Sequence, residues 1–504
     1  MSKKVRVRFA PSPTGGLHLG GVRTVLFNYL FAKQNGGDFI VRIEDTDQGR
    51  FVAGAEEYIL NTLKWCGLEP DESPLHGGPY APYRQSERKA NYKQYAEQLV
   101  HDGYAYYAFD TSEELEAKRK EVPNFQYNQF TRGGMNNSLT LSKDEVQEKL
   151  VSTPYVVRIK MVEDETVVFT DMIRGEVSFN TSQVDDKVLL KADGMPTYHL
   201  AVVVDDYLMK ISHAFRGEEW LPSAPVHILL WKYLGWEADM PQWAHLPLIL
   251  KPDGNGKLSK RDGDRLGFPV FAMDWTDPKT LETTIGFKER GFLPEAFVNL
   301  LAMLGWNDGT DREIFTLKEL VEKFSMERVH KGGAKFDYEK AKWYNHEWIK
   351  GSEVESLESG VKTEFEKNGV VITDHTLLAK VIGLVKDRCT LLPDFVQQGS
   401  FFFQSPDTID VAAVKPKWDE KKNLFFTELI RAYELSTLWE VHDLEKEFKE
   451  LAAANQLKPG DLMLPFRIML VGGKFGPGVF DIAALIGKGE TVRRIEHTLG
   501  LIEH

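Results

Sequence analysis

A glycine-rich segment near the N-terminus has the composition of a loop that binds phosphate. Residues 8–21 read RFAPSPTGGLHLGG and lie between a strand-like run and a helical run. Two prolines restrict the backbone of this segment, and four glycines let it approach a ligand closely. Free amide groups and the positive end of a helix dipole both attract an anion at such a place. The segment therefore predicts nucleotide contacts from His18, Gly20 and Gly21, with His18 as a donor to phosphate.

A second segment, far along the chain, is basic and flanked by glycines. Residues 257–261 read KLSKR, between DGNG and DGD, which is typical of a mobile loop. Such a loop is by itself usually a solvated surface segment. Together with the first segment, it could clamp a polyphosphate while negative charge redistributes in a transition state. We expect phosphate contacts from Lys257, Ser259, Lys260 and Arg261.

The hydrophobic pattern around the first loop predicts alternating strands and helices. Val5–Phe9 reads as a short strand, residues 19–30 carry apolar side chains at helical spacing, and Phe39–Ile43 reads as the next strand. Helical patterns follow over residues 52–65 and 86–100. Strand, helix and strand in this order favour a parallel sheet with crossover helices.

The pattern changes over residues 105–190, where charged helical pieces alternate with strand-like runs, so this segment reads as an insertion. After it, Thr197–Val204 is apolar enough for a buried strand. Ser223 and Pro225 are typical of a helix start, and His245–Leu250 reads as another strand.

Beyond Phe268 the chain reads as mainly helical, with apolar stripes such as residues 293–304, 377–385 and 441–451. A chain of 504 residues is too long for one core, so several domains are expected. The predicted divisions are a β/α part over 1–104 and 191–250, the insertion 105–190, a connecting region 251–330 and a helical region 331–504.

Composition narrows the class of protein. The two cysteines, Cys66 and Cys389, are too few for a disulfide framework or a cysteine-rich zinc site. No apolar run is long enough to span a bilayer, and the N-terminus has no room for a signal peptide, so we expect a cytoplasmic protein without a membrane partner. The net charge of −13 argues weakly against a nucleic-acid partner, although a local basic track remains compatible with it.

The two loops resemble the signature motifs of class I aminoacyl-tRNA synthetases. The first is similar to the family's His-x-Gly-His element, with Gly21 in the last place, and the second to its Lys-Met-Ser-Lys-Ser element. The Pro-Ser-Pro-Thr-Gly lead-in at 11–15 resembles that of glutamyl-tRNA synthetases, whereas glutaminyl enzymes carry a different one. Further similar segments follow in order nearly to the C-terminal half, at 42–47, 198–206, 216–220, 293–296 and 336–345.

This resemblance implies a Rossmann-like parallel sheet in a multidomain α/β chain. It implies an inserted α+β domain for the tRNA acceptor end, a stem-contact region that contains the KLSKR loop, and an α-helical anticodon-binding half. It also assigns a glutamate site to Arg8, Ala10, Ser12, Glu44, Tyr198 and Arg216. Two arginines suit a substrate with two carboxylates, because a guanidinium gives paired, charge-assisted hydrogen bonds. Arg8 would hold the side-chain carboxylate, and Glu44 with Ser12 would receive the amino group. Some relatives carry Asn where this chain has Val202.

The implied reaction activates L-glutamate with ATP and Mg²⁺ and transfers it to the 3′ end of tRNA(Glu), releasing AMP and pyrophosphate. No zinc is predicted, because the insertion has no Cys or His between Tyr104 and Phe130. Trp343, Tyr344 and Arg388 are candidate contacts for anticodon bases, which are read by stacking and edge contacts. We expect a monomer. The sequence leaves open whether tRNA(Gln) is charged as well.

Four alternative functions would each leave a different mark on the sequence. A truncated paralogue that glutamylates a modified tRNA base would lack residues 331–504. A glutaminyl-tRNA synthetase would carry another lead-in, and a nucleotidylyltransferase would need neither Arg216 nor a tRNA-binding half. A non-catalytic tRNA-binding relative should tolerate the loss of His18 or Lys260, and this chain keeps both.

Overall fold

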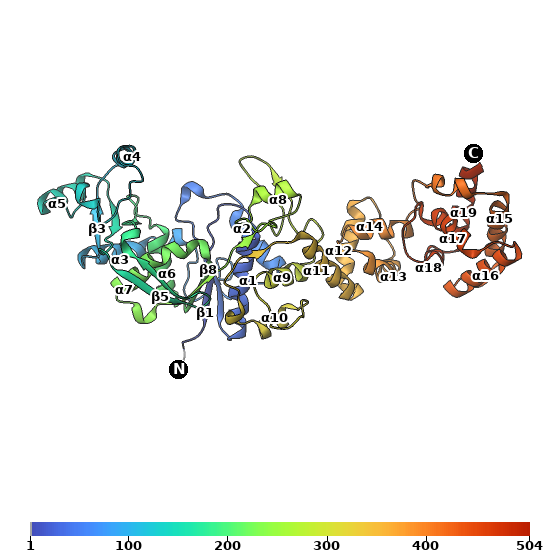
Figure 1. Ribbon diagram of the computed structural model, residues 1–504, viewed down its shortest axis with the longest axis horizontal. Helices are drawn as coiled ribbons and strands as arrows, with labels where there is room; N and C mark the ends of the chain where they lie inside the picture. Colours follow the sequence, from blue (N-terminus) through green and yellow to red (C-terminus); the bar gives the residue numbers. More distant parts are fainter. Residues whose placement is uncertain (1–2, 504) are drawn as a thin grey trace. The chain divides into compact units, whose positions relative to one another are not determined.

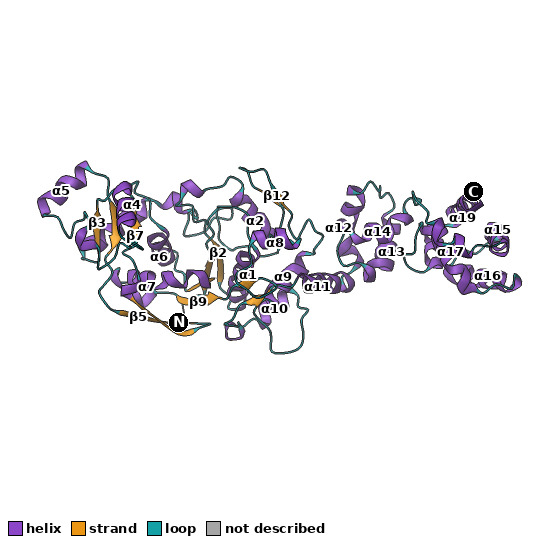
Figure 2. Ribbon diagram, turned by 45° about the horizontal axis from the view of Figure 1, so that its top comes forward, coloured by secondary structure: helices purple, strands orange, loops and turns teal. Residues whose placement is uncertain are grey.

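The computed structural model describes residues 3–503, which form two compact units. One comprises the chain up to Glu289 together with Pro294–Tyr338, and the other comprises Arg290–Leu293 together with the chain from Glu339 onward (Figure 1). The strands belong to the first unit, whereas the second is built from helices and their connecting loops (Figure 2). The predicted order, an α/β part followed by a mainly helical part, is confirmed.

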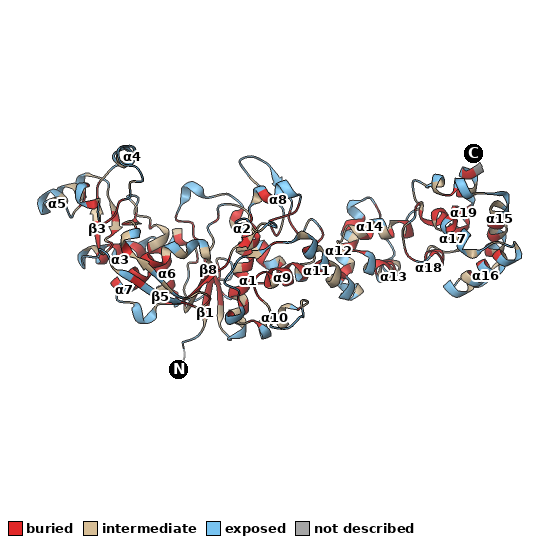
Figure 3. Cartoon of the chain, viewed as in Figure 1, coloured by how far each residue is buried: buried red, intermediate tan, exposed pale blue. Residues whose placement is uncertain are grey.

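A six-stranded sheet forms the centre of the first unit. Its order is β2 (Asp38–Val41), β1 (Arg6–Phe9), β8 (His213–Gly217), β9 (Gln242–Leu246), β5 (Thr166–Asp171) and β6 (Gly175–Asn180). The first five strands are parallel, and β6 returns antiparallel to β5. Helix α1 (Leu19–Gln34) connects β1 to β2 and packs on both, so the predicted strand–helix–strand unit is confirmed. Figure 3 shows β1 and β8 as largely buried, whereas β5 alternates exposed and buried residues and β6 has no buried residue.

One predicted strand is a helix. Thr197–Val204 was expected to form a buried strand, but Tyr198–Leu208 forms helix α6, and its residues 200–206 are all buried. A short, mainly apolar run shows neither the alternation of a half-buried strand nor the one-sided apolar stripe of a surface helix. Its pattern is therefore compatible with a buried strand and with a helix that is buried on all sides. The helix carries Asp205 and Asp206 into the interior, where each meets an arginine, Arg88 and Arg8 respectively.

The segment 105–190 contributes to two sheets. Strands β3 (Ala105–Ala108), β4 (Val156–Ile159) and β7 (Val188–Leu190) form a separate antiparallel sheet, whereas β5 and β6 extend the central one. Helices α4 (Ser112–Glu121) and α5 (Lys143–Ser152) both begin with a capping box, in which a Thr or Ser and a Glu three residues later exchange hydrogen bonds with the backbone. The strand-like runs predicted within the insertion are therefore present.

The first unit is completed by helices around the sheet and by short strand pairs. Helix α7 follows Ser223 and has Pro225 in its first turn, as predicted. The other elements are α2 (Ala55–Trp65), α3 (Ala90–His101), α7 (Ala224–Tyr233), α8 (Lys260–Leu266), α9 (Pro294–Met303), α10 (Leu317–Lys323), β10 (Ile249–Leu250), β11 (Trp275–Thr276), β12 (Thr283–Thr284) and β13 (Ala334–Lys335).

The second unit packs its helices around one continuous apolar core, which includes Val381, Phe448 and Phe466. Two of the predicted apolar stripes lie on α13 and α16. Among the described residues, no helix combines the length and apolarity that crossing a membrane requires. Its helices are α11 (Tyr338–Gly351), α12 (Val354–Lys367), α13 (His375–Val385), α14 (Asp394–Gly399), α15 (Glu420–Leu435), α16 (Val441–Ala454), α17 (Pro459–Val471), α18 (Val479–Ile486) and α19 (Lys488–Glu503).

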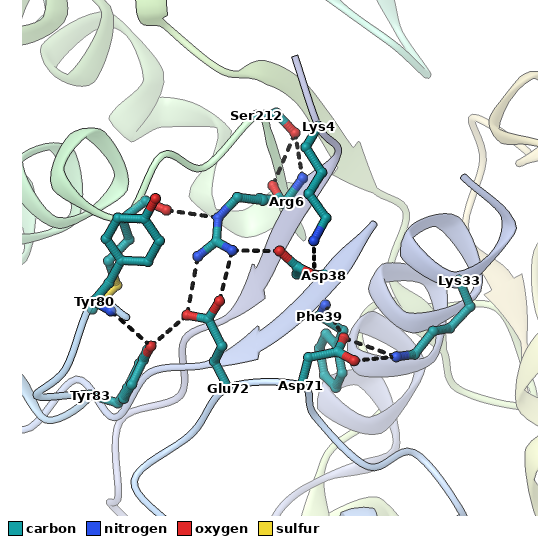
Figure 4. Close-up of polar contacts among 11 residues, drawn as sticks. Lys4, Arg6, Lys33, Asp38, Phe39, Asp71, Glu72, Tyr80, Tyr83 and Ser212 are labelled. Carbon is teal, nitrogen blue, oxygen red and sulfur yellow. Dashed lines mark hydrogen bonds and ion pairs between the residues drawn. The ribbon is translucent and has the colours of Figure 1, made fainter. Parts of the chain in front are cut away.

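A network of ion pairs around Arg6 fixes the amino ends of β1 and β2 (Figure 4). Arg6 Nη1 lies 2.6 Å from Asp38 Oδ2 and 2.7 Å from Glu72 Oε1, and the guanidinium stands over the ring of Tyr80. Tyr83 Oη donates to the same Glu72 carboxylate. Removing one partner of such a buried network costs about 3–5 kcal/mol, because it strands the other charge. The network therefore anchors β1, on which Arg8 points to the same side of the sheet as Arg6.

Candidate active site

The central sheet opens at its carboxyl edge into a cavity of about 970 Å³. The residues that line it come from the ends of β1 and β8, the loop after β2, the start of α1 and the segment before α8. They include most of the predicted nucleotide and glutamate contacts: Arg8, Ala10, Ser12, His18, Gly20, Gly21, Glu44, Tyr198, Arg216, Lys257 and Ser259. Lys260 and Arg261 lie outside the lining, at the start of α8.

His18 sits at the N-cap of α1 with one ring nitrogen free to donate. Its Nδ1 accepts from the backbone N–H of Gly20 at 3.4 Å, which places the proton on Nε2. Nε2 is enclosed and makes no hydrogen bond to the residues described, 3–503. Burial, with a smaller contribution from nearby Lys257, lowers the pKa of His18 to about 4. The ring is therefore a neutral donor at the positive end of a helix, which suits a phosphate oxygen.

The glycines around His18 leave room where a ligand would need it. A Cβ on Gly20 would meet nothing within 4 Å, so this position opens onto the cavity. A Cβ on Gly21 would lie 2.6 Å from Leu17 Cδ1, too close for any side chain without displacing the leucine. Gly21 thus allows the first turn of α1 to pack against its own loop.

The basic segment is held by its neighbours. Leu258 is buried, and its backbone N–H donates to Ile249 O at 2.9 Å. Ser259 caps α8 through reciprocal bonds with Asp262. Lys257 Nζ lies 2.6 Å from Glu219 Oε1, and both side chains are about half exposed. A lysine held by an exposed ion pair of this kind is released readily, since such pairs contribute at most about 1 kcal/mol.

Three charged side chains surround Arg8 below the cavity floor. Arg8 Nε lies 3.0 and 3.1 Å from the two oxygens of Asp206, and Arg42 Nη1 lies 2.8 Å from the same carboxylate. Arg42 Nη2 donates to Glu44 Oε1 at 3.1 Å. Arg8 Nη2 has no hydrogen-bond partner among residues 3–503. The Nε edge of the Arg8 guanidinium is therefore paired within the protein, and its Nη2 is available to a ligand.

Glu44 is a carboxyl group that titrates near neutrality. Burial raises the pKa of Glu44 to about 7, although Arg42 and Arg8 act in the opposite direction. It lines the cavity beside Ser12. A ligand ammonium would favour its charged form, so the pair provides the acceptor that an α-amino group requires.

Arg216 faces the cavity from the end of β8. Its Nη1 donates to Tyr198 Oη at 3.0 Å, and its guanidinium stands 4.9 Å from the centre of the Trp243 ring. Its Nη2 is enclosed and unpartnered within the described part of the chain. An unpaired buried donor costs about 1–3 kcal/mol, more when charged, so this nitrogen is available to an acceptor from a ligand.

Comparison with known proteins identifies the family to which this chain belongs. The family profile for the catalytic domain of class I tRNA synthetases (E and Q) matches residues 4–343, and that for an anticodon binding domain matches residues 341–499. A glutamate–tRNA ligase of Parabacteroides distasonis is 50% identical over 99% of both chains. The chain belongs to the glutamate–tRNA ligase family. The family resemblance predicted from the two loops is confirmed, since both lie within the matched catalytic domain.

Other glutamate–tRNA ligases agree in extent and fold. The ligase of Bacteroides fragilis is 51% identical over 99% of both chains. A crystal structure of a glutamate tRNA ligase from Elizabethkingia meningosepticum, in complex with its amino acid, matches with a TM-score of 0.95 and 49% identity. It covers 99% of this chain and 100% of the other. The match therefore extends through the helical half as well as the cavity.

The candidate anticodon contacts of this glutamate–tRNA ligase family member differ in exposure. Trp343 is 41% exposed on α11, and Arg388 is exposed just after α13. Tyr344 is 1% exposed, and a ring enclosed to this degree has no free face for a base. The burial of Tyr344 argues against a base contact at this residue, since aromatic residues on helices are most often core residues, and the three contacts stay predictions.

The sequence did not assign a role to several residues that shape the cavity. Asp206 orients Arg8 and Arg42, and His227 and His245 both contact Arg216. Asp206 ends an apolar run, and a charged residue in that position is a usable signal because buried acids are almost always paired. The two histidines carry no such local signal, since their partner is distant in sequence.

Proposed function

We propose that this chain joins L-glutamate to the 3′ end of tRNA(Glu) with ATP, releasing AMP and pyrophosphate. One observation supports the proposal above the others. A single cavity holds an N–H of His18 at a helix start and guanidinium nitrogens of Arg8 and Arg216, all without a hydrogen-bond partner among residues 3–503. The first suits a phosphate and the other two suit carboxylates, which are the groups that meet when an amino acid is activated by ATP.

In the proposed first step, the α-carboxylate of glutamate attacks the α-phosphorus of ATP. A bond forms between a carboxylate oxygen and the α-phosphorus while the bond between the α-phosphorus and the oxygen that bridges to the β-phosphate breaks. Pyrophosphate leaves with the electron pair of that bond. No protein nucleophile is needed, so the protein acts by positioning and by electrostatic stabilisation. His18 and Lys257 lie where they would contact the phosphates, and Gly20 and Ser259 line the same cavity. Lys260 and Arg261 would join them through movement of the loop that precedes α8.

In the proposed glutamate site, Glu44 and Ser12 receive the ammonium group, and Arg8, Tyr198 and Arg216 hold the carboxylates. Glutamine would offer Arg8 a neutral amide in place of a carboxylate and lose a charge-assisted pair, which selects against it. Val202 lines the cavity and contributes an apolar wall.

Mg²⁺ is proposed as the metal, and it would shield charge on the leaving pyrophosphate. Within residues 3–503 no three His, Cys, Asp or Glu side chains are grouped so as to hold a metal ion. Mg²⁺ needs few protein ligands when phosphate oxygens are available, so the ion would arrive with ATP. No zinc is proposed for the inserted region.

In the proposed second step, a ribose hydroxyl of the terminal adenosine of tRNA attacks the glutamyl carbonyl carbon, and AMP leaves. We assign the 2′-hydroxyl to this role from the class I resemblance. Residues 1–104 and 191–250 would form the catalytic domain, 105–190 would hold the acceptor end, 251–330 would contact the stem, and 331–504 would read the anticodon. The enzyme is proposed to act as a cytoplasmic monomer.

The decisive experiment is ATP–pyrophosphate exchange with glutamate or glutamine, each with and without tRNA. We expect exchange with glutamate in the presence of tRNA(Glu) and none with glutamine. Exchange driven by glutamine, or no exchange with glutamate plus tRNA, would overturn the proposal.

The Lys260→Ala variant tests the role of the loop. It should slow adenylate formation while tRNA affinity, measured by filter binding, stays within about twofold, because Lys260 is assigned to phosphate and not to tRNA. An unaltered rate would remove Lys260 from the site.

A further inference from the structure

Arg216 is enclosed by neutral acceptors. Its Nε donates to His245 Nε2 at 2.9 Å, and its Nη1 donates to Tyr198 Oη and to His227 Nδ1, each at 3.0 Å. No carboxylate among residues 3–503 lies within ion-pair distance of it, and it is only 6% exposed. Arg8, by contrast, is directly paired with Asp206. Arg216 therefore has no counter-ion in contact with it among these residues, although three of its N–H groups donate to neutral acceptors.

The partners of Arg216 come from adjacent strands. Arg216 on β8 is the direct cross-strand neighbour of His245 on β9, and β9 pairs in turn with β5, which ends at Asp171. His245 Nδ1 lies 2.6 Å from Asp171 Oδ2, and both side chains are fully buried. The order Asp171, His245, Arg216 therefore crosses three neighbouring strands and ends at the cavity.

Asp171 is a fully satisfied carboxylate. Its Oδ2 accepts from the ring and the backbone N–H of His245, and its Oδ1 accepts from the backbone N–H groups of Ile173 and Arg174, each at 2.9 Å. Burial acts to raise the pKa of Asp171, but the hydrogen bonds from His245 and the backbone outweigh it and lower the pKa. Asp171 is therefore charged and can only accept.

This fixes the proton positions on the neighbouring rings. Because Asp171 accepts from Nδ1 of His245, that ring carries its proton there and offers the lone pair of Nε2 to Arg216. Because Arg216 donates to Nδ1 of His227, the proton of His227 is on Nε2, which lies 3.2 Å from Nδ1 of His199. A protonated His227 or His245 would turn an N–H toward the N–H of the guanidinium. Burial lowers the pKa of both rings, in agreement with neutral tautomers.

We propose that Asp171 and His245 are positioning residues for glutamate recognition, which hold Arg216 in one orientation and leave its Nη2 for a substrate carboxylate. This inference rests on the proposed function. Neutral acceptors orient the guanidinium without cancelling its charge, so a substrate carboxylate gains a full charge-assisted pair. Because Arg8 is assigned to the side-chain carboxylate, the carboxylate left for Arg216 is the α-carboxylate, and holding Arg216 through His245 serves affinity for the amino acid.

Two substitutions of His245 separate orientation from packing. His245→Phe keeps a ring between Phe169 and Trp243 but removes the acceptor for Arg216. His245→Gln places an amide oxygen that can still accept. In tRNA-dependent exchange, we expect His245→Phe to raise the KM for glutamate about ten- to a hundredfold, with the KM for ATP within twofold. We expect His245→Gln to recover most of the loss. His213→Phe, the same change on β8 at a ring outside the cavity lining, is the matched control and should leave both KM values unchanged.

The histidine tautomers give a readout that a change in packing alone would not move. Nitrogen-15 NMR of histidine-labelled wild-type protein should show His245 protonated at Nδ1 and His227 at Nε2, and Asp171→Asn should abolish the preference at His245. This readout needs no catalysis, so it stands even if the wild type fails the exchange assay. Equal impairment of the two His245 variants, an unchanged glutamate KM in His245→Phe, or His245 protonated at Nε2 would overturn the inference.

Discussion

Replacing Glu44 by glutamine should remove the pH dependence of glutamate binding. Glu44 is the carboxyl group assigned to the substrate ammonium, and burial raises its pKa to about 7 in the free protein. A raised pKa means that the group is largely protonated below neutrality. The ammonium favours the charged form, so binding releases a proton and becomes tighter as the pH rises through 7.

The size of the effect follows from the titration of one group. With a pKa of about 7, Glu44 is charged in about one tenth of molecules at pH 6 and about nine tenths at pH 8. The Kd for glutamate should therefore fall about tenfold between these values. The histidine that lines the cavity does not interfere, because burial lowers the pKa of His18 to about 4, and burial lowers the pKa of His199, outside the lining, to about 4 as well. In Glu44→Gln the amide still accepts a hydrogen bond but lacks charge, so at pH 8 binding should weaken by about 1–2 kcal/mol, or about 5–30-fold.

Isothermal titration calorimetry measures both quantities. Titrations with glutamate at pH 6, 7 and 8, in buffers of different ionisation enthalpy, give the Kd and the number of protons released. Asp47→Asn is the control: Asp47 also lines the cavity, but Arg50 holds its pKa low, so this variant should keep the tenfold change. If the wild type binds equally at pH 6 and 8, or if Glu44→Gln keeps the tenfold change, Glu44 does not receive the ammonium.

Two further variants test the nucleotide side. His18→Phe keeps a ring beside Phe271 but loses the Nε2 donor, so single-turnover adenylate formation should slow about a hundredfold with the Kd for glutamate unchanged; a slowing below about threefold would contradict the assignment. Glu219→Gln removes the exposed partner of Lys257 and frees the lysine for ATP, so the KM for ATP should fall up to about fivefold with little change in Tm; a higher KM would show that Glu219 helps to bind ATP.

Local patterns in the sequence were sufficient for the elements that carry the cavity. The β1–α1–β2 unit follows from alternating apolar runs and a glycine-rich turn, which are features within about forty residues. Helix α6 was mistaken for a strand because its residues are buried on every side, so no polar face marks the helical period. The elements that cover α6 are its sequence neighbours β7 and α7 together with α3, which lies far away in the sequence. The hydrophobic period of α6 alone does not show that these elements pack on it.

The residues of the candidate site divide in the same way, into those that a local motif identifies and those whose role depends on tertiary packing. His18 and Glu44 could be selected because each belongs to a motif of adjacent residues. His245 could not, because it acts on Arg216 only through the pairing of β9 with β8, a tertiary fact. Tyr344 was selected because its residue type suits a base contact, but its exposure is decided by the packing of the second unit.

The net charge of the chain argued weakly against a nucleic-acid partner, but it does not describe the charge at the cavity. The net charge is −13, yet the cavity is lined by six arginine and lysine side chains against three carboxyl groups, of which Glu44 is half protonated near pH 7. An anion inside the cavity interacts with these groups at short range. The acidic groups on the outer surface act on it only weakly, because salt screens exposed charges that are more than about 10 Å away. The sign of the charge at the cavity therefore decides which ligands are attracted. This cavity suits anions such as ATP and glutamate in a protein that is acidic overall.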